Sequence, residues 1–369
     1  SGVASYQCRI DSAQVVDWTA CASPKSYTGL PDGSHTFEVR AIDQAGNADQ
    51  SPTSFSWAVD TTAPQTQIDS HPTSLSPSAT AQFTFSGSDT GGSGVASFEC
   101  RRDSAEASAW QACASPKEYA ALADGAHKLE VRAIDKAGNT DQSPATFSWT
   151  IDATAPQTQI DSGPTALTAS ATTRFTFSGS DGTGSGVASY QCRVDSIETS
   201  AWAACASPKE YAALADGAHK FEVRAIDQAG NADATPATFS WTIDSTAPQT
   251  QIDGHPSVLS ASATAQFAFS GSDTGGSGVA SFECRRDSAE ASAWQPCASP
   301  KEYASLTDGA HKFEVRAIDK AGNVDVTPAT FEWSVDTTAP STQIQSSPAA
   351  LTASAKAEFT FSGSDGTGS

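Results

Sequence analysis

The stretch that decides the fold is LADGAHKLEVRAIDKAGN, residues 122–139. Its centre alternates apolar Leu129, Val131 and Ala133 with charged residues. An alternation of period two over this length predicts a half-buried β-strand. Asp-Gly before it and Ala-Gly-Asn after it are turn signals, because Gly reaches positive φ and Asp and Asn bond their own backbone. The stretch therefore predicts a long strand bounded by two tight turns.

The same stretch recurs along the chain with a period of 92 residues, and the cysteines and tryptophans keep that period. Trp149, Trp241 and Trp333, for example, are 92 residues apart. This period is too long for a solenoid unit of roughly 20–50 residues. It is close to the roughly 100 residues of an immunoglobulin-like sandwich. Each repeat should therefore bury a core of its own.

One repeat, residues 61–152, contains seven short segments of period two separated by Gly, Pro, Asp and Ser clusters. We predict strands at residues 65–68, 81–86, 96–103, 110–113, 118–122, 127–133 and 146–151. No segment shows a helical period of 3.6. The expected fold is all-β, with two antiparallel sheets packed face to face in each repeat.

Residues 122–139, together with the boundary DATAPQTQI at 152–160, resemble the tandem bacterial Ig-like and fibronectin type III-like repeat domains of large secreted or cell-surface proteins. The resemblance covers the whole chain. It implies seven-stranded sandwiches arranged as a rod or filament, in adhesin stalks, surface fibres or spacers of extracellular enzymes. It brings no set of catalytic residues with it.

The period divides the chain into five parts, with short Pro-containing bridges such as Asp60–Pro64 between them. Proline fixes φ and restricts its neighbour, so such bridges favour a semi-rigid rod. The expected parts are an incomplete domain at 1–60 with strands three to seven, whole domains at 61–152, 153–244 and 245–336, and the first two strands of a further domain at 337–369.

The chain begins and ends in the same Gly-rich loop, since Ser1 and Ser369 are equivalent positions. Loops of the TGGSG and GTGSG kinds alternate, and the terminal GTGS matches the start. We therefore expect a segment of a longer array that forms a filament, with the chain itself as partner. The alternative is complementation of chain ends between molecules by strand addition.

Two cysteines occur in each repeat, thirteen residues apart, without the CxxC spacing of metal sites. This pattern predicts structural disulfides that tie the third strand to the fourth, and hence an extracellular or cell-surface location. The predicted pairs are Cys8 with Cys21, Cys100 with Cys113, Cys192 with Cys205 and Cys284 with Cys297.

The formal charge of −21 argues against a nucleic-acid partner, which needs a basic surface. No apolar run is long enough to span a bilayer. Calcium is the one cofactor left open, because oxygen ligands gather in each Asp-x-Ala-Gly-Asn turn and at the bridge. The candidates are Asp135, Asn139, Asp141 and Asp152, with the equivalents Asp43, Asn47 and Asp49. We favour a tight turn over a metal site, because Gly, Asn and Asp explain it unaided.

We predict that the chain is not an enzyme, since every candidate residue recurs in near-identical copies. His127 and its equivalents His35, His219 and His311 are expected at strand edges. Trp110 should pack in the core or on the disulfide rather than stack on a sugar. The predicted role is a structural region of an extracellular fibre or stalk; the alternatives are an adhesin or glycan-binding array, or a spacer in a secreted enzyme.

Overall fold

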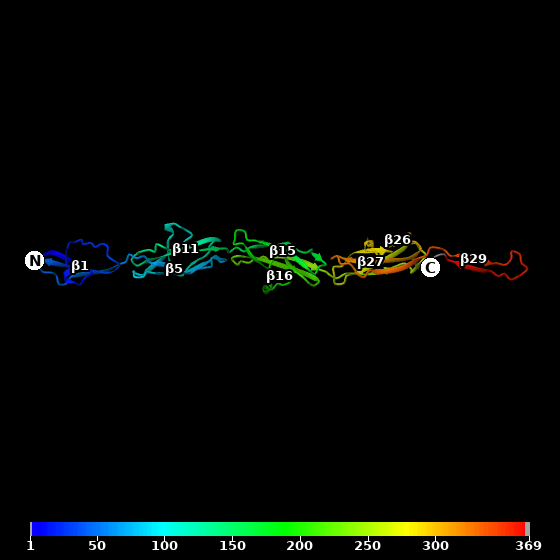
Figure 1. The fold of residues 1–369 in the computed structure, drawn as a ribbon, viewed down its shortest axis with the longest axis horizontal. Helices are drawn as coiled ribbons and strands as arrows, with labels where there is room; N and C mark the ends of the chain where they lie inside the picture. Colours follow the sequence, from blue (N-terminus) through cyan, green and yellow to red (C-terminus); the bar gives the residue numbers. More distant parts are fainter. Residues whose placement is uncertain (1, 366–369) are drawn as a thin grey trace. The chain divides into compact units, whose positions relative to one another are not determined.

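The computed structural model describes residues 2–365, and almost all of its regular elements are strands (Figure 1). Its helical elements are four single turns of three residues each: η1 (Val15–Asp17), η2 (Ala107–Ala109), η3 (Thr199–Ala201) and η4 (Ala291–Ala293). Within the described residues, no helix has the length and apolar character needed to cross a membrane. Ser1 and the terminal GTGS at 366–369 lie outside the described residues.

The chain divides into two compact units. The first comprises Ser1–Pro156, Ser180–Ala188 and Ile226–Asp233, and the second Gln157–Gly179, Ser189–Ala225 and Ala234–Ser369. Loop residues 180–188 and 226–233 thus belong with the first unit, although the strands next to them belong with the second. The division places Asp152 and the residues around it in one unit.

The first unit contains one complete sandwich of two sheets, with strand orders β10-β7-β5 and β6-β12-β11-β8-β9. Its strands are β5 (Gln65–Ser70), β6 (Leu75–Ser76), β7 (Ala81–Ser88), β8 (Val95–Arg102), β9 (Gln111–Cys113), β10 (Lys117–Tyr119), β11 (Gly125–Asp135) and β12 (Ala145–Ile151). Before it lies one sheet of order β2-β1-β3-β4. That sheet consists of β1 (Val3–Ile10), β2 (Thr19–Cys21), β3 (Gly33–Asp43) and β4 (Thr53–Val59).

The second unit repeats this arrangement in two sandwiches, followed by the two-stranded sheet β29-β30. One consists of β13 (Gln157–Ser162), β14 (Leu167–Thr168), β15 (Thr173–Ser180), β16 (Val187–Val194), β17 (Ala203–Cys205), β18 (Lys209–Tyr211), β19 (Gly217–Asp227) and β20 (Ala237–Ile243). The other, with the last sheet, consists of β21 (Gln249–Gly254), β22 (Leu259–Ser260), β23 (Ala265–Ser272), β24 (Val279–Arg286), β25 (Gln295–Cys297), β26 (Lys301–Tyr303), β27 (Gly309–Asp319), β28 (Ala329–Val335), β29 (Ser341–Ser346) and β30 (Thr360–Ser364).

The core of each sandwich forms where the apolar faces of the two sheets meet. In β11, Leu129 and Val131 are fully buried, as the alternation predicts, and they pack with Phe83 of the opposite sheet. Trp149 of β12 joins the same cluster. Burying a side chain of this size contributes about 1.5–3 kcal/mol. The second-unit sandwiches bury the equivalent residues.

The predicted all-β class of tandem sandwiches is confirmed. An eighth strand, β6, adds to the seven predicted; it pairs in parallel with the end of β12 through Leu75 and Ser76. Two residues carry no period, so periodicity could not reveal it. The domain boundaries at 60, 152, 244 and 336 and the rod or filament arrangement stay predictions.

Candidate functional site

The structure joins all eight cysteines, in the predicted pairs, between neighbouring strands of one sheet. Cys100 in β8 is bonded to Cys113 in β9, with 5.8 Å between their Cα atoms. The other pairs are Cys8–Cys21, Cys192–Cys205 and Cys284–Cys297. Each bond closes a loop that carries a turn of 3-10 helix and a tryptophan. The disulfide therefore fixes a surface loop rather than the contact between the two sheets.

Trp110, inside that loop, contacts two arginines and is not part of the core cluster. The guanidinium carbons of Arg101 and Arg132 are 4.6 and 4.3 Å from its ring centroid. Arg132 also binds Glu99, with 2.7 Å between nitrogen and oxygen. The expectation of core packing was wrong, because Trp110 is not in the core cluster and arginines on β8 and β11 offer cation–π contacts instead. Packing on the disulfide stays a prediction. Because two guanidinium groups already lie over the ring, Trp110 is a poor platform for a sugar.

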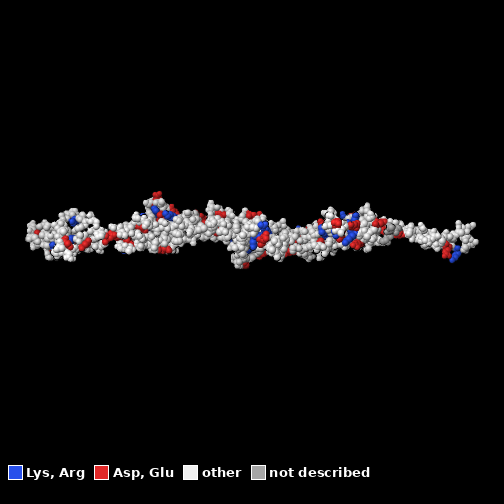
Figure 2. All heavy atoms as spheres, in the orientation of Figure 1, with Lys and Arg blue, Asp and Glu red and all other residues white. Residues whose placement is uncertain are grey.

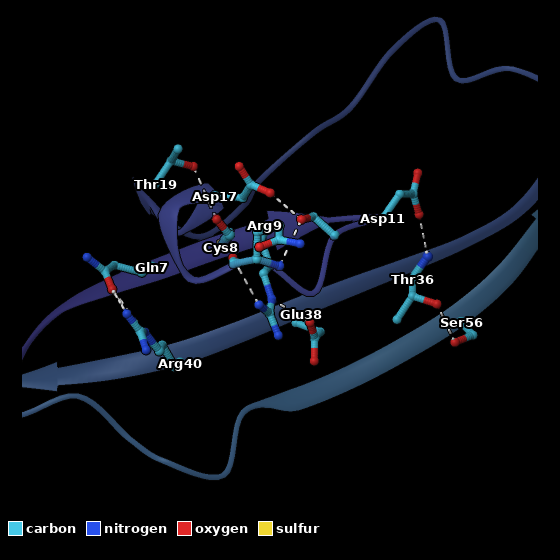
Figure 3. Close-up of polar contacts among 12 residues, drawn as sticks. Gln7, Cys8, Arg9, Asp11, Asp17, Thr19, Thr36, Glu38, Arg40 and Ser56 are labelled. Carbon is cyan, nitrogen blue, oxygen red and sulfur yellow. Dashed lines mark hydrogen bonds and ion pairs between the residues drawn. The ribbon is translucent and has the colours of Figure 1, made fainter.

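The same surface network recurs in the first sheet, where Figure 3 shows its polar contacts. Arg40 donates to Gln7 at 2.7 Å and Arg9 donates to Glu38 at 2.5 Å. Both guanidiniums lie over Trp18, at 4.3 and 4.5 Å. Acidic and basic atoms are interspersed on the face shown in Figure 2.

His127 lies within β11, opposite Trp149, and both of its ring nitrogens are engaged. Nδ1 bonds the Asp103 carboxylate and Nε2 the Ala123 carbonyl, each at 2.8 Å. Burial acts to lower the pKa of His127, but the hydrogen bonds to Ala123 and Asp103 outweigh it and the pKa is raised. A histidine held in this way positions the turn before β11 and has no free nitrogen to serve as a general base.

The bridge between the first sheet and the first complete sandwich is held by hydrogen bonds from both sides. Asp32 accepts from the backbone and hydroxyl of Thr61, at 2.9 and 2.8 Å. The amide of Asn139 donates to the backbone carbonyl of Asp60 at 3.0 Å. The backbone N–H of Ser93 donates to Asp60 Oδ2 at 2.6 Å. This bridge is therefore tied locally as well as stiffened by proline.

Three aspartates meet at each of the bridges that begin at Asp60, Asp152 and Asp244, and we call each group an acidic triad. The triads are Asp60, Asp89 and Asp135; Asp152, Asp181 and Asp227; and Asp244, Asp273 and Asp319, with one carboxylate oxygen from each residue within 4.8 Å of the others. The first residue follows the last strand of one repeat, the second lies in the Gly-rich loop and the third ends the long strand of the next repeat. Each triad lies within one compact unit.

The triads differ from the oxygen cluster expected from the sequence. Asp135 and Asp152 belong to two different triads. Asp141 belongs to neither of them and accepts a hydrogen bond from the backbone of Ser143 at 2.8 Å. Asn139 donates to Asp135 Oδ2 at 2.7 Å, so its amide orients a carboxylate. The Asp-x-Ala-Gly-Asn turn is the tight turn that the sequence favoured, since the backbone N–H of Asn139 donates to Asp135 Oδ1 at 2.8 Å.

Asp89 and its equivalents Asp181 and Asp273 were missed by sequence reasoning. A signal was present: the residue three positions later is always glycine. A Cβ atom at Gly184 would lie 2.5 Å from Asp181 Oδ2, so the loop leaves room only for the carboxylate. Hydrogen bonds from the Ser93 side chain and backbone, more than any other cause, lower the pKa of Asp60 in the first triad.

The fold and these joints define a tandem array of Ig-like sandwiches. Residues 257–334 match the bacterial Ig-like domain family, which confirms the resemblance seen in the sequence. The sequence of this matched region recurs along the chain with the period of 92 residues.

A curated relative is exoglucanase B of Cellulomonas fimi, 29% identical over 231 residues. The match covers 60% of this chain but only 21% of the relative, so the chain spans about a fifth of that enzyme.

Solved structures that match the chain include a tetra-tandem repeat in the extending region of a large adhesion protein, with 20% identity, 92% and 94% of the two chains covered and a TM-score of 0.33. The fibronectin(III)-like modules of Clostridium thermocellum CbhA are 17% identical over 48% of this chain and 94% of their own, with a TM-score of 0.32. A Ca²⁺-stabilized adhesin of an Antarctic bacterium is 17% identical over 91% of each chain, with a TM-score of 0.36.

Proposed function

We propose that the chain is a structural repeat region of an extracellular fibre or cell-surface stalk and performs no catalysis itself. The observation that carries this proposal is that each conspicuous polar or aromatic group has the same structural role in every repeat. The histidines hold turns, the tryptophans contact arginines and the cysteines close loops. A recognition array would be expected to vary where ligands bind, and these repeats hardly vary.

The proposed role is mechanical. Each of the three complete sandwiches buries a core of its own, so we expect each to unfold and refold as a unit. While the disulfide is intact, a pulling force on the unfolded sandwich cannot stretch the residues between its two cysteines. Four disulfides also support an oxidising compartment, outside the cell.

The proposed partner is a further copy of the same repeat. Successive repeats already contact one another within the chain: the Asn139 amide of one repeat donates to the Asp60 carbonyl at the end of the repeat before it, at 3.0 Å. A glycan or receptor partner belongs to the adhesin alternative.

The relation to exoglucanase B supports a second candidate, a spacer region in a secreted enzyme. A binding assay on insoluble polysaccharides distinguishes a stalk repeat or an enzyme spacer from a glycan-binding array. Neither a stalk repeat nor a spacer should be retained on the polysaccharide, whereas a glycan-binding array should be.

Single-molecule force spectroscopy tests the mechanical role. We expect one unfolding step for each complete sandwich. Reduction should lengthen each step by roughly 40 Å, because it releases the 13-residue separation of the cysteines at about 3.5 Å per residue, less the 5.8 Å that already separates their Cα atoms. A chain that extends without discrete steps, or steps unchanged by reduction, would contradict it.

A further inference from the structure

The triad of Asp152, Asp181 and Asp227 is the most buried of the three. The exposed fractions of these residues are 2%, 9% and 2%. One oxygen of each lies within 4.8 Å of the others, so three carboxylates share a small volume largely shielded from water. Like charges this close repel strongly when the local dielectric is low.

The hydrogen bonds around this triad come from neutral donors. Ser185 N–H donates to Asp152 Oδ2 at 2.6 Å, and Gly186 N–H to Asp181 Oδ2 at 2.7 Å. The Asn231 side chain donates to Asp227 Oδ2 at 2.7 Å. These donors orient the carboxylates but carry no full positive charge to balance them.

Asp181 Oδ1 differs from the other oxygens, because it is buried and has no hydrogen-bond partner. Asp89 Oδ1 and Asp273 Oδ1 share this property in the other two triads. Within residues 2–365, none of the nine triad carboxylates forms an ion pair with a lysine, arginine or histidine. A buried, ionised and unpartnered oxygen is costly unless a cation lies against it.

We propose that each acidic triad binds a divalent cation, and that calcium is the ion it fits best. Calcium takes six to eight oxygen ligands at about 2.3–2.6 Å, so two ligands on opposite sides of the ion are roughly 5 Å apart. A 4.8 Å spread of carboxylate oxygens suits such a sphere. Magnesium demands a tighter octahedron near 2.0–2.1 Å and gives up its waters reluctantly.

The ion would bind three segments at once: the end of one repeat, the Gly-rich loop and the turn after the long strand. At the first triad these are Asp60, Asp89 and Asp135, where the bridge is already tied by hydrogen bonds. Calcium at these positions would fasten each joint, whether or not the array is a fibre.

Calcium titration of the chelator-treated whole chain, by isothermal calorimetry and thermal unfolding, tests the proposal. We expect three calcium ions per chain, a rise in melting temperature on adding calcium and a smaller rise with magnesium. No binding at about 1 mM calcium, near the weak end for extracellular modules, would overturn it.

Asp181→Asn is the informative variant, because an asparagine oxygen can still accept from Gly186. It should bind two ions instead of three, and without calcium it should melt higher than the wild type, because repulsion is relieved. If the Asp181 carboxylate only stabilised the loop, the variant would instead melt lower than the wild type without calcium. Unchanged stoichiometry, or a lower melting temperature without calcium, would therefore reject the proposal.

Asp161→Asn is the matched control, since this exposed carboxylate bonds only Gln159 and Ser178. It should still bind three ions. A melting temperature that rises on mild acidification without any calcium response would show that the triad shares a proton instead, which also overturns the proposal.

Discussion

The first and second triads have the same frame but different surroundings. In both, an Asn side chain bonds the bridge carbonyl and a loop N–H bonds each of the first two carboxylates. In the first, the Lys136 ammonium lies beside Gly94, 3.5 Å from where a side chain there would begin. In the second, Gln228 occupies that place beside Gly186 at the same distance. Asp181 is also more buried than Asp89.

The difference teaches that one position can change the charge beside a joint while the hydrogen bonds that hold the joint stay the same. The residue alternates along the chain as Gln44, Lys136, Gln228 and Lys320. Lys136 and Lys320 accompany the TGGSG loops, and Gln228 accompanies the GTGSG loop. We therefore expect the Asp152 triad to bind calcium more tightly than the triads of Asp60 and Asp244.

The largest effect we predict is the loss of stability on removing a disulfide, and it should be equal in the two neighbouring sandwiches that carry the first and second triads. Removing a disulfide, as Cys100→Ser with Cys113→Ser or as Cys192→Ser with Cys205→Ser, should lower the free energy of unfolding of that sandwich by about 3 kcal/mol, the value for closing a loop of ~15 residues. Hydrogen exchange with mass spectrometry, resolved by sandwich, measures it. Clearly unequal losses would show that the repeats differ beyond their joints.

A reciprocal exchange at the varying position should convert one joint into the other. Gln228→Lys should weaken calcium binding at the second triad by about tenfold, because a nearby positive charge costs roughly 1.4 kcal/mol at an intermediate dielectric. Lys136→Gln should strengthen the first triad by a smaller factor, since water screens it more. Calorimetric titration of both variants checks this. Equal affinities at all three triads in the wild-type chain would break the comparison.

The smallest effect we predict is the pH dependence of stability that His127 and His219 produce, and it should be equal in their two sandwiches. The pKa values of His127 and His219 are raised in the folded state, since hydrogen bonds outweigh the effect of burial. Their stabilising effect is therefore fully present below the unfolded pKa of about 6.5 and is lost as pH rises through the folded value. His127→Gln and His219→Gln should each flatten the fall in melting temperature across this range. A steeper fall in either variant would contradict the assignment.

Sequence reasoning succeeded where the information was local. The alternation of Leu129 and Val131 predicted a strand face, and regular spacing predicted the cysteine pairs that the structure contains. It failed at Trp110, because strand register decides which side chains flank the ring. It also missed the triads, since Asp60, Asp89 and Asp135 come from three separate segments. Only the folded joint brings them together.

The joint contacts have a consequence for how such a chain can change length. The residues that hold each bridge recur with the same period as the cores, so a loss or gain of one whole repeat preserves every set of partners. After deletion of residues 61–152, Asp60 would meet Asp181 and Asp227 in place of Asp89 and Asp135. Unequal recombination between near-identical repeats would therefore yield foldable chains of many lengths, altering only the order of tight and weak joints.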